Sequence, residues 1–412
     1  MANMIELKNK FAQVRNQFPA LTQKVHGKDL VYLDSAATTL KPLSVIERVT
    51  RFYSYETANV HRGAHFLSDQ ATGYFEQARK NIADFIGAKS TEEVLFVKGT
   101  TEGINLVAQS WGQHFLKPDD EVVISEFEHH ANIVPWQEAC AKTGAQLRTI
   151  KFTAEGDLDY IDLENKITSK TKLVAITACS NTLGTLVNIP KVIAKARSVG
   201  ALVLVDGAQI VSQKKVDVSA WDCDFFVFSA HKIFAPFGFG VVYAKKDILE
   251  KMHPYQFGGS MISKVKFSGT TYNDLPFRFE AGTPHVEGAV GLDQALQYVE
   301  ALGFADIHRW ENHLLQKLTQ GLKNISGVRI FADLPDKGPI VSFLLEGAHP
   351  SDLGQILDQQ GIAVRAGHHC TQPLMDLLKV PGTVRASLSI YNNEEDIERL
   401  IAAIEKAKGI LL

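Results

Sequence analysis

The chain has 412 residues, of which 45% are hydrophobic and 22% are charged, and its net charge is −3. This length favours two hydrophobic cores over one, and the composition is typical of a globular protein. Acidic and basic residues are interspersed, which argues against a nucleic-acid or membrane-surface partner. No apolar run reaches the about 18 residues that a transmembrane helix needs.

The N-terminal segment 1–17 combines charged and apolar side chains at helical spacing. That spacing predicts an amphipathic helix and not a signal peptide. The four cysteines, Cys140, Cys179, Cys223 and Cys370, are scattered and include no Cys-x-x-Cys pair. We therefore expect no disulfide framework, no metal site and a reducing, cytoplasmic location.

Between residues 90 and 245, short β-branched runs alternate with stretches of helical character. Strands are expected over 93–97, 121–124, 173–177, 202–206, 225–228 and 240–243. Helices are expected between them, over 101–111, 133–143 and 190–199. Continuous apolar strands separated by helices predict an α/β fold with a mostly parallel sheet that is covered on both faces.

The order of elements changes after an expected connecting helix at 288–302. A long helix is expected over 304–325, then strands over 328–331, 340–345, 362–365 and 383–389, with helices over 353–360 and 394–408. This order predicts a smaller α+β domain. We expect a large domain at 20–290 and a small domain made of 1–19 plus 291–412.

Two successive strands of the expected sheet end in residues suited to an aldehyde cofactor. The strand 202–206 ends in Asp206, whose buried carboxylate would need a cationic partner such as a protonated pyridine nitrogen. The next strand ends in Ser229, followed by His231 and Lys232, and this lysine could bind an aldehyde covalently. Alone, Asp206 would be a helix cap and Lys232 a surface lysine, so the prediction of pyridoxal phosphate (PLP) depends on their combination.

Two further segments follow strands of the same sheet. Gly99-Thr100-Thr101 opens a helix whose free N–H groups suit a phosphate, although a plain threonine cap would give the same pattern. His129 follows the strand 121–124 and could stack on a pyridine ring, although a structural histidine is the alternative. Both positions therefore support a PLP site without establishing it.

Several motifs together resemble the class V aminotransferases, and within them the SufS-type (group II) cysteine desulfurases. They are Glu128-His129, Val205–Gln209, Ser229-x-His231-Lys232, Arg278–Pro284, Arg365–Cys370 and Val384–Ser387. Ala230, Phe237, Ala366 and Thr371 depart from the family pattern. The resemblance implies the PLP-dependent transferase fold (aspartate aminotransferase-like, fold type I), with a mostly parallel seven-stranded sheet and a smaller α+β domain.

The resemblance also implies a role for each matching residue. The PLP contacts would be Lys232 as the covalent attachment point, Asp206 at the pyridine nitrogen, Gln209 at the ring oxygen, His129 stacked on the ring, and Thr101, Ser229, His231 and the partner subunit's Thr283 at the phosphate. The substrate contacts would be Asn181, Arg385, Arg365, His61 and Arg62. The catalytic groups would be Lys232, His129 and Cys370.

Cys370 would take the sulfur of L-cysteine as a persulfide, leaving L-alanine, because a thiolate near the substrate can attack its sulfur. The alternative for Cys370 is a small buried hydrophobe. The implied partners are L-cysteine or L-selenocysteine, a second copy of the chain in a homodimer, and a SufE-like or SufU-like sulfur acceptor for iron–sulfur cluster assembly. The competing functions are a selenocysteine lyase, another PLP enzyme of this fold, and a non-catalytic scaffold.

Overall fold

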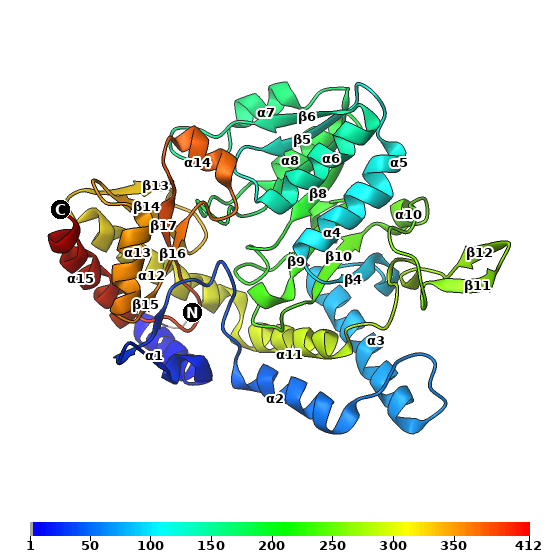
Figure 1. Cartoon of the computed structure of the whole chain (residues 1–412), viewed down its shortest axis with the longest axis horizontal. Coiled ribbons are helices and arrows are strands. Elements are labelled where there is room, and N and C mark those ends of the chain that lie inside the picture. The colour runs from blue at the N-terminus through cyan, green and yellow to red at the C-terminus, as the bar shows by residue number, and fades with distance from the viewer. Residues whose placement is uncertain (1–2) are drawn as a thin grey trace.

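The computed structural model describes residues 3–412, and its centre is a seven-stranded sheet (Figure 1). The strand order is β4-β10-β9-β8-β7-β5-β6. The strands are β4 (Val94–Val97), β5 (Glu121–Ser125), β6 (Gln146–Ile150), β7 (Thr171–Thr177), β8 (Leu202–Asp206), β9 (Phe225–Ser229) and β10 (Gly240–Ala244). β10 pairs antiparallel with both β4 and β9, and the other adjacent pairs in this sheet are parallel. The predicted mostly parallel seven-stranded sheet is confirmed.

Both faces of this sheet are buried, as continuous apolar strands require. Leu204 packs in the core cluster that contains residues of α4 and α6, whereas Val203 and Val205 pack in the cluster on the other face with α3, α8 and α11. The helices of this region are α2 (Leu43–Arg51), α3 (Phe66–Ile86), α4 (Thr100–Val107), α5 (Gln113–Phe115), α6 (Val134–Thr143), α7 (Tyr160–Lys166), α8 (Ile189–Ser198), α9 (Val218–Trp221), α10 (Lys246–Leu249) and α11 (Val286–Leu302).

A second, antiparallel sheet of order β13-β14-β17-β16 forms the smaller domain. Its strands are β13 (Val328–Phe331), β14 (Ile340–Leu345), β16 (Arg365–Gly367) and β17 (Thr383–Ser387). Its helices are α12 (Phe304–Lys323), α13 (Pro350–Gln359), α14 (Gln372–Leu378) and α15 (Glu394–Leu411). The expected N-terminal helix is α1 (Met4–Arg15), and residues 1 and 2 of that prediction lie outside the described residues.

Short strands complete the fold. β15 (Ile362–Ala363) pairs in parallel with β3 (Val31–Tyr32), which ties the N-terminal segment to the smaller domain. β1 (Lys24–Val25) pairs with β2 (Lys28–Asp29), and the hairpin of β11 (Ile262–Lys266) and β12 (Gly269–Tyr272) projects from the large domain (Figure 1). Within residues 3–412, no helix has the length and apolarity needed to cross a membrane.

The short strands β1, β2, β3, β11 and β12 and the edge strand β6 are not among the expected strands, and one expected strand is divided. The edge strand β6 has no counterpart among the expected strands, because four of its five residues are at least partly exposed and form no apolar run. The expected strand 362–365 is divided at Val364 between β15, which pairs with β3, and β16, which pairs with β17. This division brings Arg365 onto the second sheet, at the position that leads into the segment with Cys370.

Candidate active site

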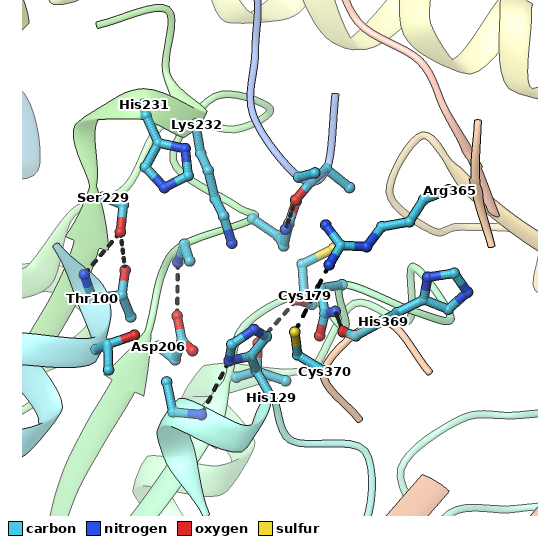
Figure 2. A pocket seen from close by; sticks show the side chains of 18 of the residues that line it. Thr100, His129, Cys179, Asp206, Ser229, His231, Lys232, Arg365, His369 and Cys370 are labelled. Atoms are coloured by element: carbon cyan, nitrogen blue, oxygen red, sulfur yellow. Dashed lines mark hydrogen bonds between the residues drawn. The ribbon is translucent and has the colours of Figure 1, made fainter. Parts of the chain in front are cut away.

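The carboxyl ends of β5, β7, β8 and β9 meet at one edge of the large sheet, where a cavity of about 180 Å³ opens. Most of the predicted site residues line this cavity (Figure 2). They are Thr101, His129, Asn181, Asp206, Gln209, Ser229, His231, Lys232, Arg365, Cys370 and Arg385. Residues of both sheets therefore contribute to one cavity.

Three predicted site residues lie elsewhere in the chain. His61 and Arg62 line a second cavity of about 250 Å³, together with Glu280 and Pro284. Thr283 lines a third cavity of about 140 Å³. A single chain therefore does not bring these three residues to the cavity that contains Lys232.

Lys232 ends the short 3-10 turn Ala230–Lys232 that follows β9, and its amine reaches into the cavity (Figure 2). Burial lowers the pKa of this amine, and the nearby Asp206 partly opposes that effect. A buried amine with a lowered pKa spends more time unprotonated, which is the form that reacts with a carbonyl carbon. The geometry therefore suits a lysine that binds an aldehyde.

The peptide before Lys232 is held by a segment that the sequence analysis did not single out. The carbonyl oxygen of His231 accepts hydrogen bonds from the Thr39 N–H, the Thr38 and Thr39 hydroxyls and the Lys41 amine, at 3.0 to 3.1 Å. The Lys41 amine also lies 4.9 Å from the centre of the Phe237 ring. No pattern in the sequence near residue 40 indicates these contacts, since they join segments almost 200 positions apart.

Asp206 is suited to a cationic partner in the cavity. Its side chain is 4% exposed, and its carboxylate accepts one hydrogen bond, from the Ala208 N–H at 2.9 Å. No ion pair joins Asp206 to another of residues 3–412. Burial raises the pKa of this carboxyl. A protonated pyridine nitrogen beside it in the cavity would oppose that effect, because a nearby positive charge favours the carboxylate. The residues present therefore fit the pyridine of PLP.

The phosphate end of such a cofactor also has a suitable cradle. The Ser229 hydroxyl accepts a hydrogen bond from the Thr100 N–H at 2.8 Å, at the N-terminus of α4. A Cβ on Gly240 would lie 2.5 Å from the Gly99 Cα, so this glycine allows the two strand ends to approach. The His231 Nδ1 is buried and has no partner among the described residues. Helix N–H groups and an unpartnered imidazole nitrogen fit an anion here.

His129 presents an uncharged ring to the cavity. Burial, then the positive charge of Lys232, lowers the pKa of His129 to about 3. Its Nδ1 accepts a hydrogen bond from the Ala131 N–H at 3.0 Å, which fixes the ring orientation. Glu128 beside it is buried, and it accepts hydrogen bonds from Ser125, Asn132 and the Thr177 N–H. A neutral, fixed ring is suited to stacking on another flat ring.

Arg385, on β17 of the second sheet, supplies a cationic group to the cavity. Its Nη1 donates to the Asn181 carbonyl at 2.9 Å and its Nη2 to Asp34 at 2.9 Å, whereas its buried Nε has no partner among the described residues. The amide of Asn181 donates to the His369 carbonyl at 2.7 Å. Arg385 therefore retains a donor for a carboxylate, while Asn181 already supports the segment before Cys370.

Cys370 differs from the other cysteines in its surroundings. Its thiol is partly exposed and lies 3.9 Å from the Arg365 Nη2. Burial raises the pKa of Cys140 to about 11 and those of Cys179 and Cys223 to about 12. Of the four cysteines, Cys370 is therefore the one placed beside a guanidinium in an accessible position.

Known proteins with similar sequences and structures identify the family of this chain. The family model for class V aminotransferases matches residues 31–400. A cysteine desulfurase of Pectobacterium carotovorum subsp. carotovorum is 47% identical over 400 residues, which cover 97% of this chain and 98% of that protein. The chain belongs to the cysteine desulfurases of the class V aminotransferase family.

Other cysteine desulfurases agree in sequence and in structure. One from Synechococcus elongatus is 48% identical over 394 residues, and the chain spans 63% of that relative's length. The structure of the cysteine desulfurase CsdA (S-sulfonic acid) from Escherichia coli has a TM-score of 0.91 and 38% identity, and covers 98% of this chain and 99% of its own. Class V aminotransferases are PLP enzymes, and the cavity around Lys232 and Asp206 fits that cofactor.

Proposed function

We propose that the enzyme removes the sulfur from L-cysteine, releases L-alanine and retains the sulfur as a persulfide on Cys370. The observation that carries this proposal is the single cavity shared by the Lys232 amine and the Cys370 thiol. Bound PLP would withdraw the electrons that remain when a proton leaves the substrate Cα. A transaminase needs the lysine but has no use for a thiol in the same cavity.

The chain's own groups would handle the substrate at its carboxylate and its α-carbon. The Arg385 Nε, which has no partner among residues 3–412, can donate to the substrate carboxylate. With the carboxylate held there, the unprotonated Lys232 amine can take the Cα proton and later return it. Its burial favours this role, because burial lowers the pKa of the amine.

The sulfur step needs the thiolate of Cys370. This thiolate would attack the substrate sulfur, forming an S–S bond while the substrate Cβ–S bond breaks. The electron pair of the broken bond would remain on carbon, which takes up a proton to give the methyl group of alanine. One cysteine and one enzyme thiol thus give one alanine and one enzyme persulfide, with no external oxidant.

The reaction is tested by supplying L-cysteine to the PLP-loaded protein and measuring alanine in a single turnover. We expect about one alanine and one persulfide per active site, with further turnover when dithiothreitol or a SufE-like or SufU-like acceptor removes the sulfur. Transfer to such an acceptor would supply iron–sulfur cluster assembly. A colourless protein that forms no alanine would instead favour the non-catalytic scaffold, and cleavage of L-selenocysteine without cleavage of L-cysteine would favour the lyase.

We also propose a homodimer in which Thr283, His61 and Arg62 complete the partner's cavity. This proposal is supported by their positions in two other cavities of their own chain, away from Lys232. Light scattering at the assay concentration is expected to give twice the mass of one chain. A fully active monomer in this measurement would contradict the proposal.

A mixing experiment tests the shared site directly. We expect the Arg62→Ala homodimer and the Lys232→Ala homodimer each to be less active than the wild type, because every active site in either homodimer lacks one native residue. After the two variants are mixed and allowed to exchange subunits, a heterodimer would contain one site with both native residues. Activity should therefore rise above the sum of the separate variants, and an absence of recovery despite measured subunit exchange would refute a shared site.

A further inference from the structure

The segment that contains Cys370 has an unusual backbone. His369 and Cys370 have φ angles of +53° and +59°, a region that residues with side chains seldom occupy. Two successive residues there cost free energy, so surrounding contacts must hold them in place. Cys370 therefore depends on contacts from outside its own segment for its position.

His130 makes two such contacts, both with the backbone that follows the Cα of Cys370. Its backbone N–H donates to the Cys370 carbonyl at 2.8 Å. Its ring Nε2 accepts a hydrogen bond from the Gln372 N–H at 2.9 Å, across 242 positions of sequence. Gln372 is the first residue of α14, where N–H groups have no partner within the helix. The ring of His130 therefore satisfies a donor that the helix itself leaves unpaired.

Other contacts hold the two residues that flank Cys370 in the chain. The Asn181 amide donates to the His369 carbonyl at 2.7 Å, and the hydroxyls of Thr182 and Thr371 lie 2.9 Å apart. The His369 ring is 3% exposed and bonds to Thr383. Among residues 3–412, only His130 forms hydrogen bonds to both the Cys370 carbonyl and the amide two positions later.

We infer that His130 is a positioning residue. By accepting a hydrogen bond from the Gln372 N–H, it holds the Cys370 thiol where the thiol can reach the substrate sulfur. The inference rests on the proposed role of Cys370 and adds to it a residue from the large domain. His130 starts the 3-10 turn His130–Asn132 after His129, which faces the cavity. The same turn thus joins the ring-stacking histidine to the segment of the nucleophile.

The acceptor state of His130 agrees with this role. An imidazole accepts a hydrogen bond at Nε2 only when that nitrogen carries no proton. Burial, then the charge of His368, lowers the pKa of His130 and so favours the neutral ring. His368 is exposed and its ring forms no hydrogen bond with residues 3–412, which makes it a matched control of the same residue type beside Cys370.

The first measurement is hydrogen–deuterium exchange of the peptide that contains Gln372, on PLP-loaded enzyme without substrate. His130→Leu replaces the accepting ring with an apolar side chain of similar size. In this variant the Gln372 amide should exchange about fivefold faster than in the wild type, which is the factor expected when one hydrogen bond of average strength is lost. His130→Gln places an acceptor oxygen near the Nε2 position and should restore slow exchange. His368→Leu should leave the exchange rate of Gln372 unchanged, because burial, the larger cause of the lowered His130 pKa, still favours the neutral ring.

The second measurement is cysteine-dependent alanine formation. His130→Leu should lower kcat by about 10- to 100-fold, since misplacing a reacting group by about 1 Å has effects of this size. KM for L-cysteine should change little, because Arg385 and Lys232 are untouched. His130→Gln should recover most of kcat. If His130→Leu fails to fold, His130→Asn, whose shorter side chain cannot reach Gln372, takes its place.

Each outcome decides the inference. Unchanged exchange in His130→Leu, faster exchange with unchanged kcat, or a His130→Gln variant as impaired as His130→Leu would each overturn it. Failure of the proposed function is recognised separately, through full desulfuration by Cys370→Ala. In that case faster exchange in His130→Leu would still show the contact, but the role of His130 in sulfur transfer would be refuted.

Discussion

Replacing Lys232 with alanine is expected to lower the rate of alanine formation from L-cysteine by about 10³-fold or more. The variant loses both the amine that would bind the PLP aldehyde and the base that would move the Cα proton. Lys232 is the lysine that lines the cavity beside Asp206, and burial lowers the pKa of its amine. The yellow absorbance of lysine-bound PLP should disappear, although the phosphate cradle can still bind PLP noncovalently.

The measurement combines the activity assay with borohydride reduction and peptide mass analysis. Wild-type enzyme should yield a PLP adduct on the peptide with Lys232, and the variant should yield none. Lys170→Ala, at an exposed turn before the N-terminal end of β7, whose other end borders the cavity, is the control and should retain colour and activity. A borohydride-stable lysine adduct in Lys232→Ala would show that another lysine binds the cofactor.

The strand ends could be predicted from sequence because the pattern is local. An apolar run ending in Asp206 and another ending in Ser229 predict polar groups at one edge of a parallel sheet, and both groups line the cavity. The edge strand β6 gave no such signal, since its residues are largely exposed. Local pattern therefore reveals buried strands and the groups at their ends, but not a solvated edge.

Contacts between distant segments could not be predicted in the same way. The pairing of Cys370 with the cavity was expected only from the resemblance to the cysteine desulfurases, because no local pattern joins the second sheet to the first. The contact of His130 with Gln372 and that of Lys41 with the His231 carbonyl follow no periodicity. Such contacts depend on how the two sheets pack, which is a property of the folded chain.

His369 illustrates a further limit of sequence reasoning. A histidine next to Cys370 suggests a positive charge that could favour the thiolate. Its ring instead bonds to Thr383, and burial lowers the pKa of His369 to about 3, so the ring is neutral near pH 7. The positive group beside the Cys370 thiol is Arg365, whose Nη2 lies 3.9 Å from the sulfur. Adjacency in sequence alone therefore did not distinguish the neutral His369 from the charged Arg365.

Replacing Cys370 with alanine or serine is expected to abolish sulfur transfer from L-cysteine while leaving PLP bound. Asp206, His129, Ser229 and Lys232 are unchanged, so colour and the spectral change on adding L-cysteine should persist. The serine hydroxyl remains protonated near neutral pH and is a much weaker nucleophile than a thiolate, so alanine formation should fall by about 10³-fold.

The backbone is not expected to obscure this result. Cys370 already has a φ of +59°, so alanine or serine would carry similar strain at the same position. Thermal unfolding of each variant should therefore lie close to that of the wild type. Cys140→Ser and Cys223→Ser serve as controls for activity, because neither residue lines the cavity and burial raises the pKa of each thiol far above neutral pH.

Mass analysis locates the sulfur itself. Wild-type enzyme treated with L-cysteine, alkylated and digested should carry one added sulfur on the peptide with Cys370. L-selenocysteine, if selenide leaves without a thiol, should still be cleaved by Cys370→Ala, which would separate loss of the nucleophile from general damage to the site. A persulfide found only on Cys140, Cys179 or Cys223, or full desulfuration of L-cysteine by Cys370→Ala, would refute Cys370 as the acceptor, because each result requires the substrate sulfur to leave by a route that avoids the thiol beside Arg365.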